Sequence, residues 1–158
     1  MSIDGGMETV VRERKAECCC GEVSITLRGE PERIIRCHCQ YCQRRTGSVF
    51  QVSAWFFEDQ IVHRTGVTRV FNDSPQNPGA VDYTFCARCG STVYWPIKPF
   101  PGIYGVAVGC FADADFPAPN FDLQRLHQHA WVPSLDLAES YEEFPPDEEM
   151  APKREPAV

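Results

Sequence analysis

Short apolar runs recur along the chain and predict that it folds largely as β-strands. Val23, Ile25 and Leu27 alternate with polar neighbours, and a half-buried strand has this period of two. Other runs rich in β-branched and aromatic residues predict further strands at 49–57, 61–63, 68–71, 81–85, 92–95, 104–108 and 131–132. The number and spacing of these runs favour an all-β or β-rich domain.

Turn residues and short helical stretches fall between the strand candidates. Thr65-Gly66 lies between two of these runs and predicts a hairpin-like pair. The segment 72–79, NDSPQNPG, has the composition of a loop. Helical candidates are limited to 40–45 and to a turn at 121–126. The predicted domain therefore consists of short strands joined by tight turns.

Length and composition are those of one globular domain. The 158 residues are 43% hydrophobic and 23% charged, which excludes a collagen, a coiled coil and a wholly disordered chain. No apolar run approaches the roughly 20 residues of a membrane helix. The N-terminal stretch lacks the apolar centre of a signal peptide, so we expect a cytoplasmic protein in a reducing compartment.

Most of the net charge of −7 lies near the C-terminus. Residues 139–158 contain seven acidic and two basic side chains together with four prolines. We therefore expect a solvated, largely disordered tail from Pro145 onward, and an acidic interaction tail is the alternative. The body of the chain has no basic stripe, so nucleic acid is not an expected partner. The predicted organisation is an N-terminal tail at 1–14, a domain at 15–138 and an acidic, proline-rich tail at 139–158.

The nine cysteines point to metal chemistry. Disulfides are rare in a reducing compartment, and cysteines in C-x-C or C-x-x-C spacing there more often bind metal. Eight of the nine fall into three clusters, at 18–20, 37–42 and 86–89. The ninth, Cys110, stands alone, and we expect it to pack in the core, as we do for Cys19.

The first and third clusters fit one closed zinc site. Cys86 and Cys89, followed by Gly90, form a knuckle that offers two sulfurs to one ion. Cys18 and Cys20 supply a second pair, because residues i and i+2 of a strand point the same way. Such a Cys₄ site would hold structural zinc and tie the start of the domain to its middle. The alternative is a redox pair at Cys86 and Cys89, but that motif normally opens a helix in a βαβ unit, and the sequence shows none.

The middle cluster offers three sulfurs, from Cys37, Cys39 and Cys42, with no evident fourth ligand. Three protein ligands and an open position are typical of a catalytic zinc. A thiol that binds such an ion is deprotonated, so a thiol substrate suits the site. His38 is a candidate fourth ligand, although alternation points it away from the cysteines beside it. A closed site completed by another side chain is the remaining alternative, and its candidates are Cys110, His127 and His129.

Together, the three clusters resemble the pattern of the glutathione-dependent formaldehyde-activating enzyme family, whose domain is shared with a centromere-associated protein. That pattern has C-x-C-G near its start, then C-H-C-x-x-C-R-R-x-x-G, then F-C-x-x-C-G-S. The matching residues here are Cys18, Cys20, Gly21, Cys37, His38, Cys39, Cys42, Arg44, Arg45, Gly47, Phe85, Cys86, Cys89, Gly90 and Ser91. A looser match continues through 109–113 and 129–134, so the resemblance covers about residues 15 to 135.

Two features depart from the family pattern. Gln43 follows the third cysteine of the middle cluster, where the pattern has Arg, and precedes Arg44-Arg45. The Trp that the pattern has shortly after Ser134 is missing, and 135–138 stand in its place. Both departures concern contacts to a substrate and leave the expected fold unchanged.

The resemblance implies a zinc-containing β-tent fold built from small antiparallel sheets, with two zinc ions per chain. It implies a structural zinc on the four residues Cys18, Cys20, Cys86 and Cys89, in agreement with the spacing argument. It implies a second, catalytic-type zinc on the three residues Cys37, Cys39 and Cys42.

The activity that the resemblance implies is that of a carbon–sulfur lyase, which joins glutathione to formaldehyde and gives S-hydroxymethylglutathione. Glutathione carries two carboxylates, and guanidinium groups bind carboxylates in a bidentate manner. Arg44 and Arg45 are therefore the candidate substrate-binding residues, with solvated surface charges as the alternative. Two rival hypotheses concern the whole chain. The first is a non-catalytic, zinc-stabilised module that binds a protein, and the second is zinc buffering or thiol redox sensing by the middle cluster.

Overall fold

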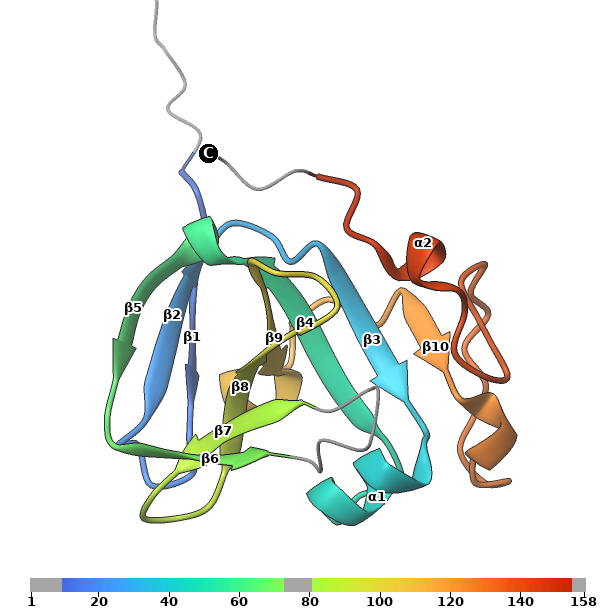
Figure 1. Ribbon diagram of the computed structural model, residues 1–158, viewed down its shortest axis with the longest axis horizontal. Coiled ribbons are helices and arrows are strands. Elements are labelled where there is room, and N and C mark those ends of the chain that lie inside the picture. The colour runs from blue at the N-terminus through green and yellow to red at the C-terminus, as the bar shows by residue number, and fades with distance from the viewer. Residues whose placement is uncertain (1–9, 73–80, 155–158) are drawn as a thin grey trace, which may run out of the picture.

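The β-rich prediction is confirmed by the computed structural model, which describes residues 10–72 and 81–154 (Figure 1). Within these residues, ten strands form two sheets. The three-stranded sheet consists, in spatial order, of β1 (Glu13–Glu17), β2 (Ser24–Arg28) and β5 (Ile61–Thr65). The seven-stranded sheet consists, in spatial order, of β10 (Phe121–Leu123), β3 (Arg33–Cys37), β4 (Gln51–Phe57), β9 (Ile103–Ala107), β8 (Thr92–Pro96), β7 (Asp82–Cys86) and β6 (Thr68–Asn72).

Neighbouring strands are antiparallel except at one edge of the larger sheet. There β10 lies parallel to β3, with Phe121 opposite Ile35 and Leu123 opposite Cys37. On its other side, β3 pairs antiparallel with β4. The end of β3, where the middle cysteine cluster begins, is therefore held by a strand on each side.

Residues 61–72 connect the two sheets instead of forming the predicted hairpin. β5 pairs with β2 and β6 pairs with β7, so the two strands belong to different sheets. Gly66 lies between them with φ +89°, and a Cβ at this position would collide with the backbone carbonyl of Glu22. Glycine permits both the positive φ and the close approach. The turn thus directs the chain from one sheet into the other. Most of the predicted loop 72–79 lies outside the described residues.

The predicted helix at 40–45 is confirmed as α1 (Gln40–Thr46). Cys39 caps its N-terminus, because its Sγ accepts a hydrogen bond from the backbone N–H of Cys42 at 3.2 Å. Gly47 ends the helix in the left-handed conformation. The other helical elements are single turns: η1 (Glu58–Gln60), η2 (Val108–Phe111), η3 (Arg125–His127) and α2 (Asp147–Met150). Among the described residues, no helix is long and apolar enough to cross a membrane.

Two further local predictions differ from the structure, and one strand is missing from the prediction. Residues 121–123 form β10 rather than a helical turn, because all three are buried beside β3, and η3 follows them. Residues 131–132 lie in a turn and not in a strand. The sequence does not predict β1, because the run ERKAE is mostly charged and its buried positions are Arg14 and Ala16.

The C-terminal segment packs on the domain as far as Arg154, which corrects the expectation of a disordered tail from Pro145. Met150 in α2 is buried in a hydrophobic core. The buried side chain of Arg33 donates a hydrogen bond to the carbonyl of Ala151 at 2.8 Å. In Figure 1 this segment lies beside β10 and β3. Apolar burial and carbonyl acceptors thus outweigh the polar composition of this stretch.

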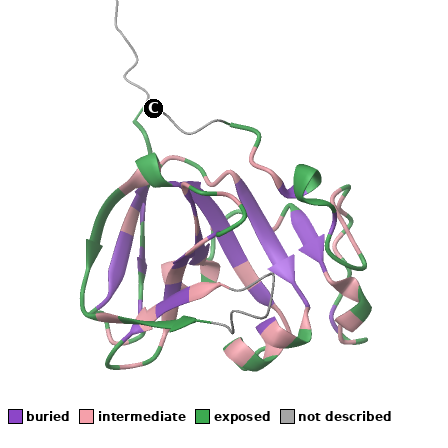
Figure 2. Ribbon diagram, in the orientation of Figure 1, coloured by how far each residue is buried: buried purple, intermediate pink, exposed green. Residues whose placement is uncertain are grey.

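Strand β4 separates two hydrophobic cores. Trp55 belongs to one core and the next residue, Phe56, to the other, because successive side chains of a strand point to opposite faces. Figure 2 shows the buried residues along β2, β3, β4 and β10, whereas β5 and β6 are mostly exposed. Each core contains part of one cysteine group: Cys37 and Cys42 in the first, Cys18 and Cys86 in the second.

A buried ion network fastens β10 to β3. Asp122 accepts hydrogen bonds from Arg36 at both oxygens, with Nε–Oδ1 at 2.9 Å and Nη2–Oδ2 at 2.6 Å. Burial alone would raise the pKa of Asp122, but the hydrogen bonds and charge of Arg36 lower it. Burial lowers the pKa of His38, so its ring is neutral at pH 7 and Nε2 donates to Asp122 Oδ1 at 2.9 Å. The Asp122 carboxylate therefore compensates the buried charge of Arg36.

Replacing Asp122 with Asn should lower the free energy of unfolding by about 3 kcal/mol, because the Arg36 guanidinium would remain buried without its counter-charge. Urea unfolding followed by tryptophan fluorescence measures the change. As a control, Asp59→Asn breaks the exposed ion pair with Arg154 and should cost less than about 1 kcal/mol. Equal losses in the two variants would show that the buried network contributes no more than a surface pair.

Candidate metal centres

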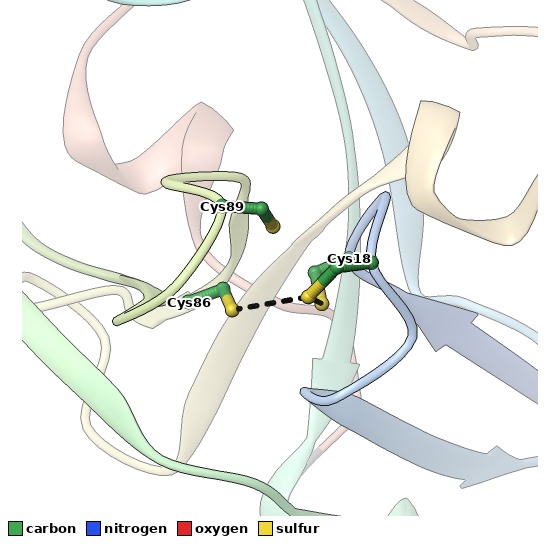
Figure 3. Close-up of side chains that lie close together, drawn as sticks. Cys18, Cys86 and Cys89 are labelled. Carbon is green, nitrogen blue, oxygen red and sulfur yellow. Dashed lines mark hydrogen bonds between the residues drawn. The ribbon is translucent and has the colours of Figure 1, made fainter.

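The first group consists of Cys18, Cys20, Cys86 and Cys89. It lies between a turn of the three-stranded sheet and a turn of the seven-stranded sheet. Cys18 and Cys20 are in the turn between β1 and β2, whereas Cys86 ends β7 and Cys89 lies in the turn before β8. Figure 3 shows the sulfurs of Cys18, Cys86 and Cys89 converging from these two turns. All four sulfurs lie within 4.8 Å of one another. The structure thus brings together the four cysteines that the spacing predicts as one site.

The separation of these sulfurs is that of ligands around a single zinc ion. Cys20 Sγ is 3.5 Å from Cys18 Sγ and 3.7 Å from Cys86 Sγ. Four sulfurs bound tetrahedrally at about 2.3 Å from zinc are about 3.8 Å from one another. Thiolates this close repel one another unless a cation offsets their charge. The group can therefore bind a metal ion, and thiolate donors favour zinc among the common divalent ions.

Both pairs of cysteines are presented by turns that a glycine closes. The Gly21 N–H donates to the carbonyl of Cys18 at 2.9 Å, and the Gly90 N–H donates to the carbonyl of Cys86 at 3.0 Å. Both glycines have positive φ. Cys18 and Cys20 therefore face the same way because the chain turns, and not because they alternate along a strand as predicted.

The surroundings of Cys89 and Cys20 shift the pKa values of these two thiols in opposite directions. Hydrogen bonds from Ser91, whose Oγ is 3.3 Å from Cys89 Sγ, lower the pKa of Cys89 to about 5. A hydrogen bond from the Glu22 backbone lowers the pKa of Cys20, but desolvation and the neighbouring sulfurs outweigh it and raise the value to about 12. Four thiolates therefore do not coexist at neutral pH without a cation, and metal binding releases protons.

The second group lies where β3 passes into α1. Cys37 is the last residue of β3, Cys39 caps α1, and Cys42 lies in the first turn of that helix. The three sulfurs are within 4.8 Å of one another, and two of them are buried. Among residues 10–72 and 81–154, no other cysteine, histidine or carboxylate joins this group. The predicted alternatives therefore do not complete it: His38, Cys110, His127 and His129.

Crowding also dominates the protonation of this second group. Hydrogen bonds from Cys37 and Cys42 lower the pKa of Cys39 to about 2. Contacts with the other two sulfurs, together with burial, raise the pKa of Cys37 far above its usual value. The pKa of Cys42 rises to about 12, because Cys39 and burial outweigh the lowering effect of Cys37. The three sulfurs therefore share one negative charge. A soft cation can bind to such a set of sulfur ligands.

Gln43 connects this group to the loop after β10. Its Nε2 donates to the carbonyl of His38 at 2.7 Å and to the carbonyl of His127 at 3.1 Å. Its Oε1 accepts from His129 Nε2 at 3.0 Å. The residue that departs from the family pattern therefore has a positioning role here, and His129 contacts α1 rather than the three sulfurs.

The two predicted substrate-binding arginines have different surroundings. Arg44 is exposed on α1. Arg45 is half-buried, its guanidinium lies 4.0 Å from the ring centroid of Tyr83, and Nη2 donates to Gln51. Its positive charge offsets a small part of the rise in the pKa of Cys42. Arg45 is therefore fixed beside the sulfurs, whereas Arg44 is open to solvent.

The two cysteines outside both groups do not behave alike. Cys19 is exposed, which corrects the prediction that it packs in the core. Its backbone N–H donates to Ser91 Oγ at 3.2 Å. Cys110 packs against the second core as predicted, and its thiol donates to the carbonyl of Thr92. Burial raises the pKa of Cys110 to about 11.

Several residues that support the second group are not among the predicted site residues: Arg36, Gln43, Tyr83 and Asp122. The sequence holds one signal for them, because Asp122 stands between the apolar residues Phe121 and Leu123. A carboxylate in such a run is usually buried with a partner. The sequence does not identify that partner, since Arg36 is 86 residues away.

The chain is similar to one described protein family. A sequence model of a family described as glutathione-dependent formaldehyde-activating enzyme matches residues 13–131. No curated protein matches the chain. A crystal structure of a Rhodobacter sphaeroides protein is similar with a TM-score of 0.46 and 21% sequence identity, covering 80% of this chain and 98% of that chain. The family match spans both cysteine groups and ends before the C-terminal segment.

Replacing Gln43 with Ala should lower the free energy of unfolding by about 1–2 kcal/mol, because two carbonyls and one imidazole lose their partner. Amide hydrogen exchange should become faster in residues 127–132, which Gln43 ties to α1. Gln40→Ala, an exposed position on the same helix, is the matched control and should leave both measurements unchanged. Unchanged exchange in the Gln43 variant would contradict the positioning role.

Proposed function

Because the chain belongs to the glutathione-dependent formaldehyde-activating enzyme family, we propose that it is a zinc-dependent enzyme of the carbon–sulfur lyase type. Its substrates are a thiol such as glutathione and a small aldehyde such as formaldehyde, and its product is S-hydroxymethylglutathione. The family match over residues 13–131 supports the reaction class. The clustered cysteines support the metal.

The observation that carries this proposal is the group of three cysteine sulfurs at the junction of β3 and α1. Cys37, Cys39 and Cys42 would hold one zinc ion through thiolate sulfur, which suits this metal. When bound there, zinc favours the thiolate form of a thiol at neutral pH. No other described ligand side chain joins these three, so the ligand set is that of a site which also accepts a substrate.

The four-cysteine group would hold a second zinc ion with a structural role. Its ligands come in pairs from the β1–β2 turn and from the end of β7 with the turn that follows. A closed set of four thiolates leaves no position for a substrate. Zinc at this site would therefore stabilise the contact between the two sheets, while the chemistry takes place at the second group.

The reaction forms one carbon–sulfur bond. The sulfur of the thiol bonds to the carbonyl carbon of the aldehyde while the carbon–oxygen π bond breaks. The proton lost by the thiol ends on the former carbonyl oxygen. The contribution of the chain is to hold thiol and aldehyde together, which replaces an encounter in solution by a reaction within one complex.

The charges around α1 favour an anionic thiol. Arg45 is held by Tyr83 and Gln51, which places its guanidinium near Cys42. Arg44, one residue earlier and exposed, can reach a carboxylate of the substrate. Glutathione has two carboxylates, so these side chains support it as the thiol.

Cys39→Ser should reduce the zinc content from two ions per chain to one and abolish formation of S-hydroxymethylglutathione. The physical reason is that a hydroxyl oxygen is a poor zinc ligand and two sulfurs remain. Elemental analysis measures the zinc, and NMR with ¹³C-labelled formaldehyde measures the product. The far-UV circular dichroism should stay that of the wild type, because Cys39 is only half-buried and a serine hydroxyl can also cap α1.

The matched control for that experiment is Cys110→Ser, which alters a cysteine outside both groups and should leave zinc content and turnover unchanged. Full activity of Cys39→Ser after loss of one zinc would disprove the proposed role of the second group. Two zinc ions with no response to any thiol would instead favour a zinc-stabilised binding module.

Arg44→Gln should raise the KM for glutathione by about fivefold and leave kcat unchanged, because an exposed ion pair to a substrate carboxylate contributes about 1 kcal/mol to binding. Cysteamine, a thiol without carboxylates, should react equally with both proteins. Arg28→Gln on β2, also an exposed arginine, is the matched control. A KM unchanged for glutathione would remove Arg44 from the substrate site.

A further inference from the structure

The turn between β1 and β2 carries a third cysteine that neither metal group uses. Cys19 is exposed, whereas its neighbours Cys18 and Cys20 point into the four-cysteine group. An exposed thiol beside thiolate ligands is open to reagents in solution. A sulfur of the four-cysteine group that lies close to Cys19 is its candidate partner for a disulfide.

Ser91 places Cys19 beside Cys89. One hydroxyl, Ser91 Oγ, accepts from the backbone N–H of Cys19 at 3.2 Å and lies 3.3 Å from Cys89 Sγ. The side chain of Cys19 also contributes to lowering the pKa of Cys89, which agrees with this proximity. Cys89 is half-buried, whereas Cys18 and Cys86 are buried. Among the four grouped sulfurs, Cys89 thus combines a shared Ser91 partner with Cys19 and access from solvent.

We infer that Cys19 is a redox-modification site, at which a low-molecular-weight disulfide is reduced while a Cys19–Cys89 disulfide forms. The inference rests on the four-cysteine zinc site proposed above and concerns a residue that the proposed reaction does not use.

The exchange proceeds in two steps. First, the Cys19 sulfur attacks the disulfide, forms a mixed disulfide and releases one thiolate. Second, the Cys89 sulfur attacks Cys19 Sγ, so the second thiolate leaves. The two cysteines lose two electrons, and the external disulfide gains them as it becomes two thiols. These thiols take up the proton of Cys19 and one proton from solvent.

Disulfide formation removes one ligand from the metal. Three sulfurs would remain, from Cys18, Cys20 and Cys86, and they would hold a metal ion more weakly than four. Because the four-cysteine group links the β1–β2 turn to the end of β7 and the turn before β8, loss of the ion loosens the contact between the sheets. Cys19 would therefore couple the thiol–disulfide balance of the surroundings to the stability of the fold.

The test uses the full zinc-containing chain and glutathione disulfide as the oxidant. Elemental analysis first counts the zinc, and a chromogenic chelator then follows its release. Free thiols are alkylated, the protein is digested with trypsin, and disulfide-linked peptides are identified by mass spectrometry. Trypsin cuts after Arg88 and separates Cys86 from Cys89, and fragmentation of the linked peptides distinguishes Cys19 from Cys18 and Cys20, and Cys89 from Cys110, which share tryptic peptides. We expect a Cys19–Cys89 link and release of about one zinc ion per chain.

Two variants make the result specific. Cys19→Ser should abolish the link and slow zinc release by about tenfold, since the exposed attacking thiol is missing. Cys110→Ser removes the other cysteine outside both groups and should behave as the wild type. Reduction with dithiothreitol should restore zinc binding in the wild type.

Other outcomes overturn the inference and are separable from failure of the proposed enzyme activity. Equal rates of zinc release from Cys19→Ser and wild type, or a disulfide that joins Cys19 to any other cysteine, would show that it is wrong. If the isolated chain holds no zinc at the first group, the predicted release of zinc is wrong. Peptide mapping then still tests whether a disulfide forms between Cys19 and Cys89. Loss of turnover alone bears on the second group and leaves this inference unchanged.

Discussion

Repulsion among crowded thiolates is the constraint on which both cysteine groups depend. Seven sulfurs lie in two groups, and within each group they are no more than 4.8 Å apart. The opposite pKa shifts of Cys39 and Cys42 show that such groups do not ionise together without a cation. A bound metal ion would offset this repulsion at either group. The chain therefore concentrates seven potential metal ligands at two points.

The architecture uses the two groups differently. The first group joins turns from two sheets, so its integrity affects the contact between them. The second group lies at one strand end, and its supports are local: α1 presents two of the sulfurs, and the Arg36–Asp122–His38 network fixes the strand that carries the third. Gln43 adds the loop after β10 to this support. A site held by several independent contacts can keep its ligands in place while a substrate binds.

Much of the site follows from sequence spacing. Cysteines two or three residues apart have to be close in any fold, so the pairs at 18–20 and 86–89 and the triple at 37–42 were predictable. Their association with one another was a weaker prediction, because it depends on where the turns meet. The exposure of Cys19 was not predictable, because the side chains of a turn do not alternate between two faces as those of a strand do. The C-terminal segment was mispredicted because composition reports average polarity and not the few buried contacts of Met150 and Ala151.

The sequence by itself determined the β-rich class, the position of α1 and the membership of the cysteine pairs, because alternation and short-range spacing are local properties. Only the tertiary structure decided which strands share a sheet, why β5 and β6 separate at Gly66 and how Asp122 comes to neutralise Arg36. It also decided that Cys19 faces solvent beside Cys89. These features depend on residues many positions apart, and their meeting is fixed by packing and charge compensation rather than by any local pattern.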